Sequence, residues 1–232
     1  MKKFVIIIGV MLLLVGCSGM KKEKNDAFLF KEEYESLNGE KNSKDISYRV
    51  LDIEEDNPFV YKDANDIIEM IDNKDTFVVY FGFASCPWCR SVIYNMIDVA
   101  DELEIDTIYY VDVKDIRDVM AIDEDGDIYI SKEGANDYYT LLDRIGSVLD
   151  DYTLTDNDGN EVNTNTKRIY APNVVAVVDG VPTKMTTGIS DLQENAYMEL
   201  TEEINDESFD KIKCTIECVV EKKNICTADK RC

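Results

Sequence analysis

The chain has 232 residues, with 25 Lys and Arg against 48 Asp and Glu, which gives a net charge of −23. An acidic excess of this size argues against binding to nucleic acid and against close contact with anionic lipid headgroups, and it is typical of a well-solvated surface. The chain holds seven cysteines and no histidine, so zinc sites that use histidine ligands are excluded.

The first residues have the pattern of an export signal. Lys2 and Lys3 precede the apolar run 4–15, which is too short to span a bilayer. Leu14-Val15-Gly16-Cys17 resembles the lipobox of bacterial lipoproteins, which implies cleavage before Cys17 and diacylglycerol on its sulfur. We therefore expect residues 1–16 to be a lipoprotein signal peptide, and lipid on Cys17 to hold the chain on the outer face of the cell membrane. An ordinary signal peptide and an uncleaved anchor are the alternatives.

Residues 17–45 are predicted to connect this lipid to a folded domain. Residues 18–25 are polar and lysine-rich, as in a flexible tether. Residues 27–43 have helical periodicity and are predicted to form a short helix outside the main fold. Residues 46–205 are long enough to bury one sizeable core and are expected to form a single domain.

The first half of this domain is predicted to begin with a strand over 46–53 and a helix over 66–71. Phe77–Phe83 is a run of β-branched and aromatic residues, which predicts a buried strand. Apolar residues at 92, 93, 96, 97 and 100 then predict a helix that packs on that strand.

Cys86-Pro87-Trp88-Cys89-Arg90 lies between this strand and this helix. At a helix N-terminus, unpaired amides and the macrodipole stabilise a thiolate, and Pro87 suits the first helical turn. A thiolate with a second sulfur in reach is what reversible disulfide exchange requires. The motif therefore predicts a redox pair, with half of a zinc site and a purely structural disulfide as alternatives. Arg90 either lowers the pKa of the thiol or is an exposed helix residue.

The second half alternates strands, turns and helices. The predicted elements are a buried strand over 105–113, a turn at 123–127 followed by a short strand over 128–130, a helix over 138–149, a hairpin turn at 156–160, a central strand over 174–178 with a partner over 182–187, and an acidic helix over 191–203. The two acidic turns lack the ligand order of an EF-hand, so no calcium site is predicted.

Residues 206–232 are expected to form a short Cys-rich tail. Its cysteines are Cys214, Cys218, Cys226 and Cys232. In an oxidising compartment four cysteines are expected to form two structural disulfides, and three pairings are possible. A metal site and free thiols are the alternatives.

The order of these elements, the Cys86–Cys89 motif and the corner Tyr170-Ala171-Pro172 before the strand at 173–178 resemble the thioredoxin family over about residues 46–203. The resemblance implies an α/β fold, a three-layer sandwich with a central mixed sheet, to which the Cys-rich tail is added. It also implies that Pro172 is cis and faces the cysteines, and that the backbone of Ala171 hydrogen-bonds an extended substrate.

The chain departs from the family at several positions. Tyr80 stands where the family has a buried acid, and Tyr94 where it commonly has a proline that kinks the helix. Insertions around 119–134 and 151–166 enlarge the fold. These differences bear on rate and substrate preference more than on the exchange chemistry.

The function expected from the sequence is that of an extracytoplasmic thiol–disulfide oxidoreductase acting on protein cysteines and recharged by a redox partner. Cys86 is expected to be an exposed nucleophile, Cys89 to resolve the mixed disulfide, and Pro87 and Trp88 to tune the reduction potential. The absence of histidine favours a reducing or isomerising role over a strongly oxidising one. No cofactor and no metal are expected. The alternatives are a non-enzymatic accessory lipoprotein, similar to those of bacteriocin export, and a metal chaperone that uses the tail cysteines.

Overall fold

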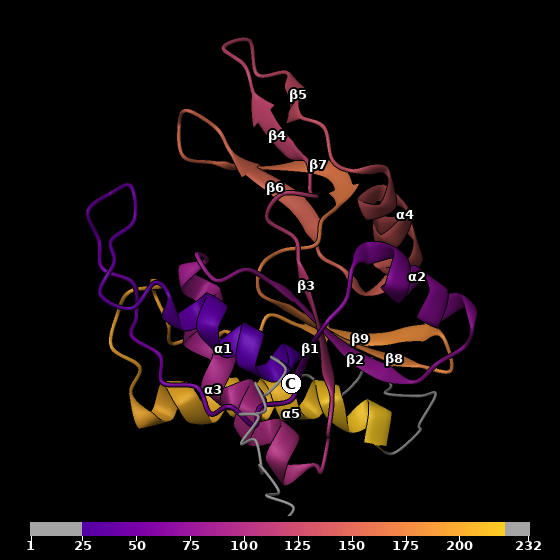
Figure 1. Cartoon of the computed structure of the whole chain (residues 1–232). Helices are drawn as coiled ribbons and strands as arrows, with labels where there is room; N and C mark the ends of the chain where they lie inside the picture. The colour runs from indigo at the N-terminus through magenta and orange to yellow at the C-terminus, as the bar shows by residue number, and fades with distance from the viewer. Residues whose placement is uncertain (1–24, 221–232) are drawn as a thin grey trace, which may run out of the picture.

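The computed structural model describes residues 25–220, which are built around a five-stranded mixed sheet (Figure 1). In spatial order the strands are β1 (Phe59–Tyr61), β3 (Ile108–Asp112), β2 (Phe77–Gly82), β8 (Asn173–Val178) and β9 (Val181–Thr186). The first three strands of this order are parallel, and β8 and β9 each run antiparallel to their neighbour. The expected α/β architecture with a central mixed sheet is confirmed.

Helices cover both faces of the sheet, which makes three layers. One face packs against α1 (Asp26–Glu35), α3 (Pro87–Glu102) and α5 (Glu202–Val220), and the other against α2 (Ala64–Asp72) and α4 (Asn136–Ile145), which the 3-10 turn η1 (Gly146–Val148) follows (Figure 1). Successive side chains of a strand point to opposite faces. Tyr80 therefore enters the core with α3, while Val79 and Phe81 enter the core with α2 and α4.

The register of β2 with β8 positions the candidate site. Phe81 pairs with Asn173, so the last residues of β2 lie beside the first residues of β8. The segment that follows Gly82 therefore meets the segment that precedes Asn173 at one edge of the sheet. Both strands are buried throughout, which makes this edge a rigid support.

The helix expected over residues 27–43 forms as α1 and is shorter, and the expectation that it lies outside the main fold is wrong. Phe30 and Tyr34 are buried in the same core as α3. The Phe30 ring stacks on Phe59 at a centroid distance of 3.9 Å and meets the ring of Tyr110 edge-on at 5.0 Å. These partners come from β1 and β3, so α1 is part of the layer that covers the sheet.

The strand expected over residues 46–53 does not form, although Leu51 and Ile53 are buried. In this segment, side chains form the hydrogen bonds to backbone N–H and carbonyl groups that a neighbouring strand would form in a sheet. The Asn38 amide bonds both the carbonyl and the N–H of Leu51, and Glu35 accepts the N–H of Ile53. The first strand of the sheet is instead β1, which follows Pro58 directly.

The acidic helix expected over residues 191–203 is also wrong. Residues 191–201 form turns, in which Asn195 accepts the Tyr197 N–H, because Asn side chains compete with helical hydrogen bonding. The helix is α5, which runs through much of the segment expected as a tail. It packs on β8 and α3 and buries Ile212 and Ile216.

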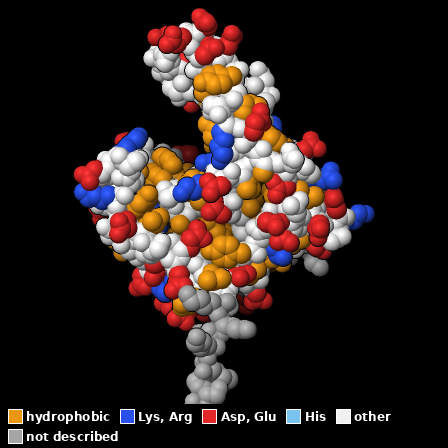
Figure 2. All heavy atoms as spheres, turned by 45° about the horizontal axis from the view of Figure 1, so that its top comes forward, with side chains coloured by type: hydrophobic (Ala, Val, Ile, Leu, Met, Phe, Trp, Pro, Cys, Tyr) orange, Lys and Arg blue, Asp and Glu red, His pale blue; other side chains and the backbone are white. Residues whose placement is uncertain are grey.

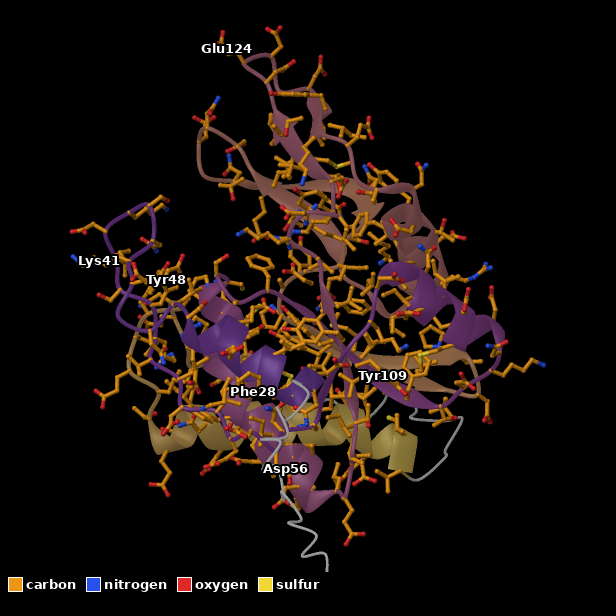
Figure 3. All side chains as sticks on the ribbon, in the orientation of Figure 1. Phe28, Lys41, Tyr48, Asp56, Tyr109 and Glu124 are labelled. Atoms are coloured by element: carbon orange, nitrogen blue, oxygen red, sulfur yellow. The ribbon has the colours of Figure 1, made fainter. Side chains whose placement is uncertain are left out.

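Two hairpins project beyond the sheet, at the top of Figure 1. They are β4 (Val119–Ile122) with β5 (Ile128–Lys132), and β6 (Asp151–Thr155) with β7 (Glu161–Lys167). We call residues 119–132 and 151–167 the hairpin arm. Figure 2 shows it protruding with acidic side chains at its tip, where Figure 3 labels Glu124. Both turns and the strand at 128–130 were predicted.

Candidate redox site

Two segments from distant parts of the sequence meet at the edge where β2 ends and β8 begins. The loop after β2 leads into Cys86, which is the N-cap residue of α3, with Pro87 in the first helical turn. Opposite it, the peptide bond between Ala171 and Pro172 is cis, as the sequence resemblance implied. The predicted cysteine pair and the predicted corner are therefore neighbours.

Cys86 is held between its own helix and this corner. The backbone N–H of Cys89 donates a hydrogen bond to the Cys86 sulfur at 3.2 Å. The Cys86 thiol donates to the carbonyl oxygen of Ala171, also at 3.2 Å. Cys86 and Cys89 are both free thiols, so the structure represents the reduced state of the pair.

The expectation of an exposed nucleophile is wrong, because only 4% of the Cys86 surface is exposed. Its contact with Ala171 closes one side of the sulfur. The chain neighbours Pro87 and Trp88, and Ala171 opposite, are only partly buried.

The surroundings shift the pKa values of the two thiols in opposite directions. Hydrogen bonding from the Cys89 thiol lowers the pKa of Cys86 below its ordinary value, and this outweighs the opposite effect of burial. Amides of Trp88 and Cys89 and the charge of Arg117 lower it further. Burial raises the pKa of Cys89 well above its ordinary value. Cys86 is therefore the sulfur that ionises first, and Cys89 remains a protonated donor beneath it.

Arg117 is the nearby cation, not Arg90. The Arg117 guanidinium lies over the ring of Phe83 at 5.1 Å and acts on the charges of both cysteines. Arg117 precedes the first insertion in the sequence, and no motif there indicated that it would lie near the cysteines. Arg90 is 1% exposed, so it is not the exposed helix residue of one alternative, and it is not among the main groups that shift the pKa of Cys86. It instead donates to carbonyl oxygens of Tyr34, Arg49 and Ala84 and ties α3 to the N-terminal segment.

The position where the resemblance leads one to expect a buried acid holds a buried phenol. The Tyr80 hydroxyl lies 2.9 Å from the Tyr34 hydroxyl, and both residues are fully buried. Tyr80 also acts on the Cys89 thiol by hydrogen bonding, which lowers the pKa of that thiol. The sequence indicated the missing acid, but it gave no sign that Tyr34 in α1 would be the partner.

The other predicted cysteines lie apart from this pair. Cys214 and Cys218 in α5 both form disulfides. Cys218 packs on Ala176 and Val178, in the half of β8 away from the candidate site. Cys17, Cys226 and Cys232 lie outside the described residues, so the lipidation of Cys17 and the pairing of the tail cysteines stay predictions.

A hollow of about 540 Å³ runs along α5 and is lined by charged side chains, among them Asp191, Glu207 and Lys211. Lys211 forms ion pairs with both carboxylates, at 2.6 and 2.8 Å, so these three charges already partner one another. Within residues 25–220 there is no group of three or more side chains suited to hold a metal ion. No helix in the same range is long and apolar enough to cross a membrane.

The chemistry that this arrangement permits is nucleophilic attack by one sulfur and displacement by the second. Both are thiols in the first turn of one helix, and a backbone carbonyl faces the first. The sequence matches no protein-family model, and no curated protein is significantly similar to it. The candidate function therefore depends on the geometry of these residues.

Proposed function

We propose that the chain is a thiol–disulfide oxidoreductase of the thioredoxin-like fold that acts on cysteines of polypeptides. The observation that carries the proposal is the environment of Cys86. This free thiol caps a helix, accepts the Cys89 amide, has a lowered pKa and faces the Ala171 carbonyl beside a cis proline. A lowered thiol pKa with a second thiol in the same turn suits disulfide exchange at neutral pH.

In the reducing direction the Cys86 thiolate attacks a client disulfide. One client sulfur leaves as a thiolate, and a mixed disulfide joins Cys86 to the other. The Cys89 sulfur then attacks Cys86 Sγ, and the bond between Cys86 and the client breaks. The proton lost by Cys89 balances the proton gained by the released client thiol. Two electrons pass from the pair to the client, and a redox partner must return them.

The Ala171 carbonyl supports a role in client binding. A thiol donates to this oxygen, whereas a thiolate has no proton to donate. Ionisation of Cys86 therefore leaves the oxygen without that donor, and a client backbone N–H is the natural replacement. A client held there would lie next to the sulfur that attacks it. Pro87 and Trp88 would contact the same client, because both are partly exposed around Cys86.

We further propose that the chain works outside the cytoplasm, anchored to the cell membrane by lipid on Cys17. The sequence of residues 1–17 supports this. The disulfides of Cys214 and Cys218 agree with it, because disulfides persist in oxidising compartments.

The test is reduction of insulin disulfides by the full-length chain in detergent, with dithiothreitol as the electron source. Wild type is expected to accelerate the reduction, and Cys86→Ser is expected to abolish the acceleration. Cys89→Ser is expected to accumulate a mixed disulfide between Cys86 and the client. Ser85→Ala, beside the nucleophile, is the matched control. Full activity in Cys86→Ser would overturn the role of this cysteine.

The direction of electron flow is a separate part of the proposal. Trp88 is apolar and no histidine stabilises the thiolate, so we place the pair on the reducing or isomerising side. The measurement is the reduction potential of the Cys86–Cys89 pair. A value near that of thioredoxin, about −270 mV, agrees with this, and one near that of DsbA, about −120 mV, contradicts it.

A non-enzymatic accessory lipoprotein of the bacteriocin-export type is the second candidate. The burial of Cys86 favours it, because a sulfur with 4% exposure can be a structural thiol. Alkylation separates the two candidates. An enzyme nucleophile is expected to react with iodoacetamide in the native chain faster than a free cysteine at pH 7. A structural thiol is expected to react only after unfolding.

A further inference from the structure

The corner that faces Cys86 is fastened to the hairpin arm through the side chain of Tyr170. The Tyr170 hydroxyl donates a hydrogen bond to the carbonyl of Asp151 at 3.2 Å and accepts one from the N–H of Thr153 at 3.0 Å. Both partners are backbone groups of β6. The residue after Tyr170 is Ala171, whose carbonyl accepts the Cys86 thiol at 3.2 Å. Two successive residues therefore join the arm on one side to the candidate nucleophile on the other.

The base of the arm is itself held by a buried ion pair. Arg168 contacts the Asp118 carboxylate at 2.9 Å and donates to the Asp118 carbonyl at 3.0 Å. Asp118 directly precedes β4 and Arg168 directly follows β7, so this pair joins the two hairpins. The Arg168 guanidinium also lies over the ring of Tyr152 at 4.0 Å, and that ring meets the Tyr170 ring edge-on at 6.2 Å. Tyr170 therefore binds to a fixed support, because Arg168, Asp118 and Tyr152 are each less than a tenth exposed.

The hydrogen bond between Cys86 and Ala171 stabilises the neutral form of the thiol. A carbonyl oxygen accepts the proton of a thiol and offers no proton to a thiolate, so this contact opposes ionisation. The same carbonyl closes one side of a sulfur that is only 4% exposed. The position of the Ala171 carbonyl therefore governs both how easily Cys86 ionises and how closely a reagent can approach its sulfur.

We propose that Tyr170 is a positioning residue that holds the Ala171 carbonyl against the Cys86 sulfur, and that Arg168 supports it by fixing the base of the hairpin arm. The inference rests on the proposed function, in which the same carbonyl binds the client backbone. While the corner is held, the thiol stays covered and protonated between clients, and the carbonyl stays where a client N–H meets it. Loosening the corner therefore makes Cys86 more reactive toward a small reagent and less effective toward a polypeptide.

The experiment compares a small reagent with a polypeptide, using the full-length chain in detergent. Alkylation of Cys86 by iodoacetamide at pH 7 is followed by peptide mapping, which separates it from the other cysteines. Reduction of insulin, with dithiothreitol as the electron source, gives kcat and KM. Tyr170→Phe removes only the hydroxyl that binds β6. Tyr152→Phe is the matched control, because its hydroxyl accepts the Met120 N–H at 3.3 Å within the arm while its ring stays against Arg168.

In Tyr170→Phe we expect alkylation of Cys86 to be about 2- to 10-fold faster, the range for loss of one neutral hydrogen bond. KM for insulin should rise by a similar factor, because the Ala171 carbonyl is no longer held in place for the client. A merely structural defect would instead slow both reactions. Tyr152→Phe should change neither. Arg168→Met should also speed alkylation, although loss of its positive charge alone would disfavour the thiolate and slow the reaction.

Alkylation of Tyr170→Phe at or below the wild-type rate would overturn the inference, and so would an unchanged KM or an equal acceleration in Tyr152→Phe. If Tyr170→Phe does not fold, Arg168→Met decides, and alkylation that is no faster there overturns the inference. A wild-type chain that does not reduce insulin would refute the proposed function. The alkylation rates would still decide whether Tyr170 controls Cys86, so the two failures are distinguishable.

Discussion

Replacement of Arg90 by methionine is expected to destabilise the fold strongly. This side chain is 1% exposed and holds the N-terminal segment against α3. Its guanidinium donates to the carbonyls of Arg49 at 2.8 Å, Tyr34 at 2.7 Å and Ala84 at 3.3 Å, and to the side chain of Asn38 at 3.0 Å. Methionine keeps most of the apolar stem but offers no donor.

The magnitude follows from two opposing effects. Each hydrogen bond to a charged group contributes about 1.5–3 kcal/mol. Burial of the guanidinium costs several kcal/mol, and the carbonyl of Tyr34 keeps a second donor in the N–H of Ser36. The substitution leaves several buried carbonyl oxygens without this donor, at about 1–3 kcal/mol each, so we expect a net loss of about 3–5 kcal/mol. This is a large share of the 5–15 kcal/mol by which domains are typically stable.

The assay is urea unfolding followed by circular dichroism. The matched control is Arg144→Met, which removes an ion pair with Asp72 whose side chains are 42% and 54% exposed. We expect the control to lose less than about 1 kcal/mol. An Arg90→Met chain whose free energy of unfolding lies within about 1 kcal/mol of wild type would refute the reasoning.

Three further predictions concern charge and location. Arg117→Gln is expected to raise the pKa of Cys86 toward 9.0, because a nearby cation is lost; the midpoint of the iodoacetamide reaction rate should move to higher pH, and an unchanged midpoint contradicts this. A hydrogen bond from Lys211 holds the pKa of Glu207 at about 2, below its ordinary 4.5. The ionised carboxylate therefore stabilises the fold fully above pH 4.5 and loses this effect as the pH falls toward 2. Glu207→Gln should accordingly lower Tm at pH 7 but not at pH 2, whereas an equal loss at both would exclude the ionic contribution. Cys17→Ser should move the chain from the membrane fraction to the soluble fraction, and continued membrane retention would rule out the lipid anchor.

The sequence predicted the parts of the site that depend on local pattern. The continuous apolar run Phe77–Phe83 predicted a buried strand and the helical periodicity after Cys86 predicted a helix, and the structure contains both. The cis peptide bond at Pro172 was predicted from resemblance, not from the residues around it. For these two segments the local pattern was sufficient, whereas for residues 46–53 and 191–203 it was not.

The features that the sequence did not indicate depend on distant partners. Cys86 is buried because Ala171, far along the chain, lies against its sulfur. Arg90 is buried where backbone carbonyls accept its hydrogen bonds. Every residue has such a carbonyl, so the sequence does not indicate which ones will meet Arg90. The helix α1 belongs to the core because Phe59 from β1 stacks on Phe30. No local pattern could show these contacts.

The hairpin arm can change in length without changing the geometry of the cysteine pair. Both hairpins leave the core at the edge that carries the cysteines, one after β3 and the other before β8. Each forms its own two-stranded ladder, apart from the five-stranded sheet. Lengthening or shortening either turn would therefore leave the register of β2 with β8 intact. Evolution or design could therefore vary the surface beside this edge while the two sulfur atoms stay fixed.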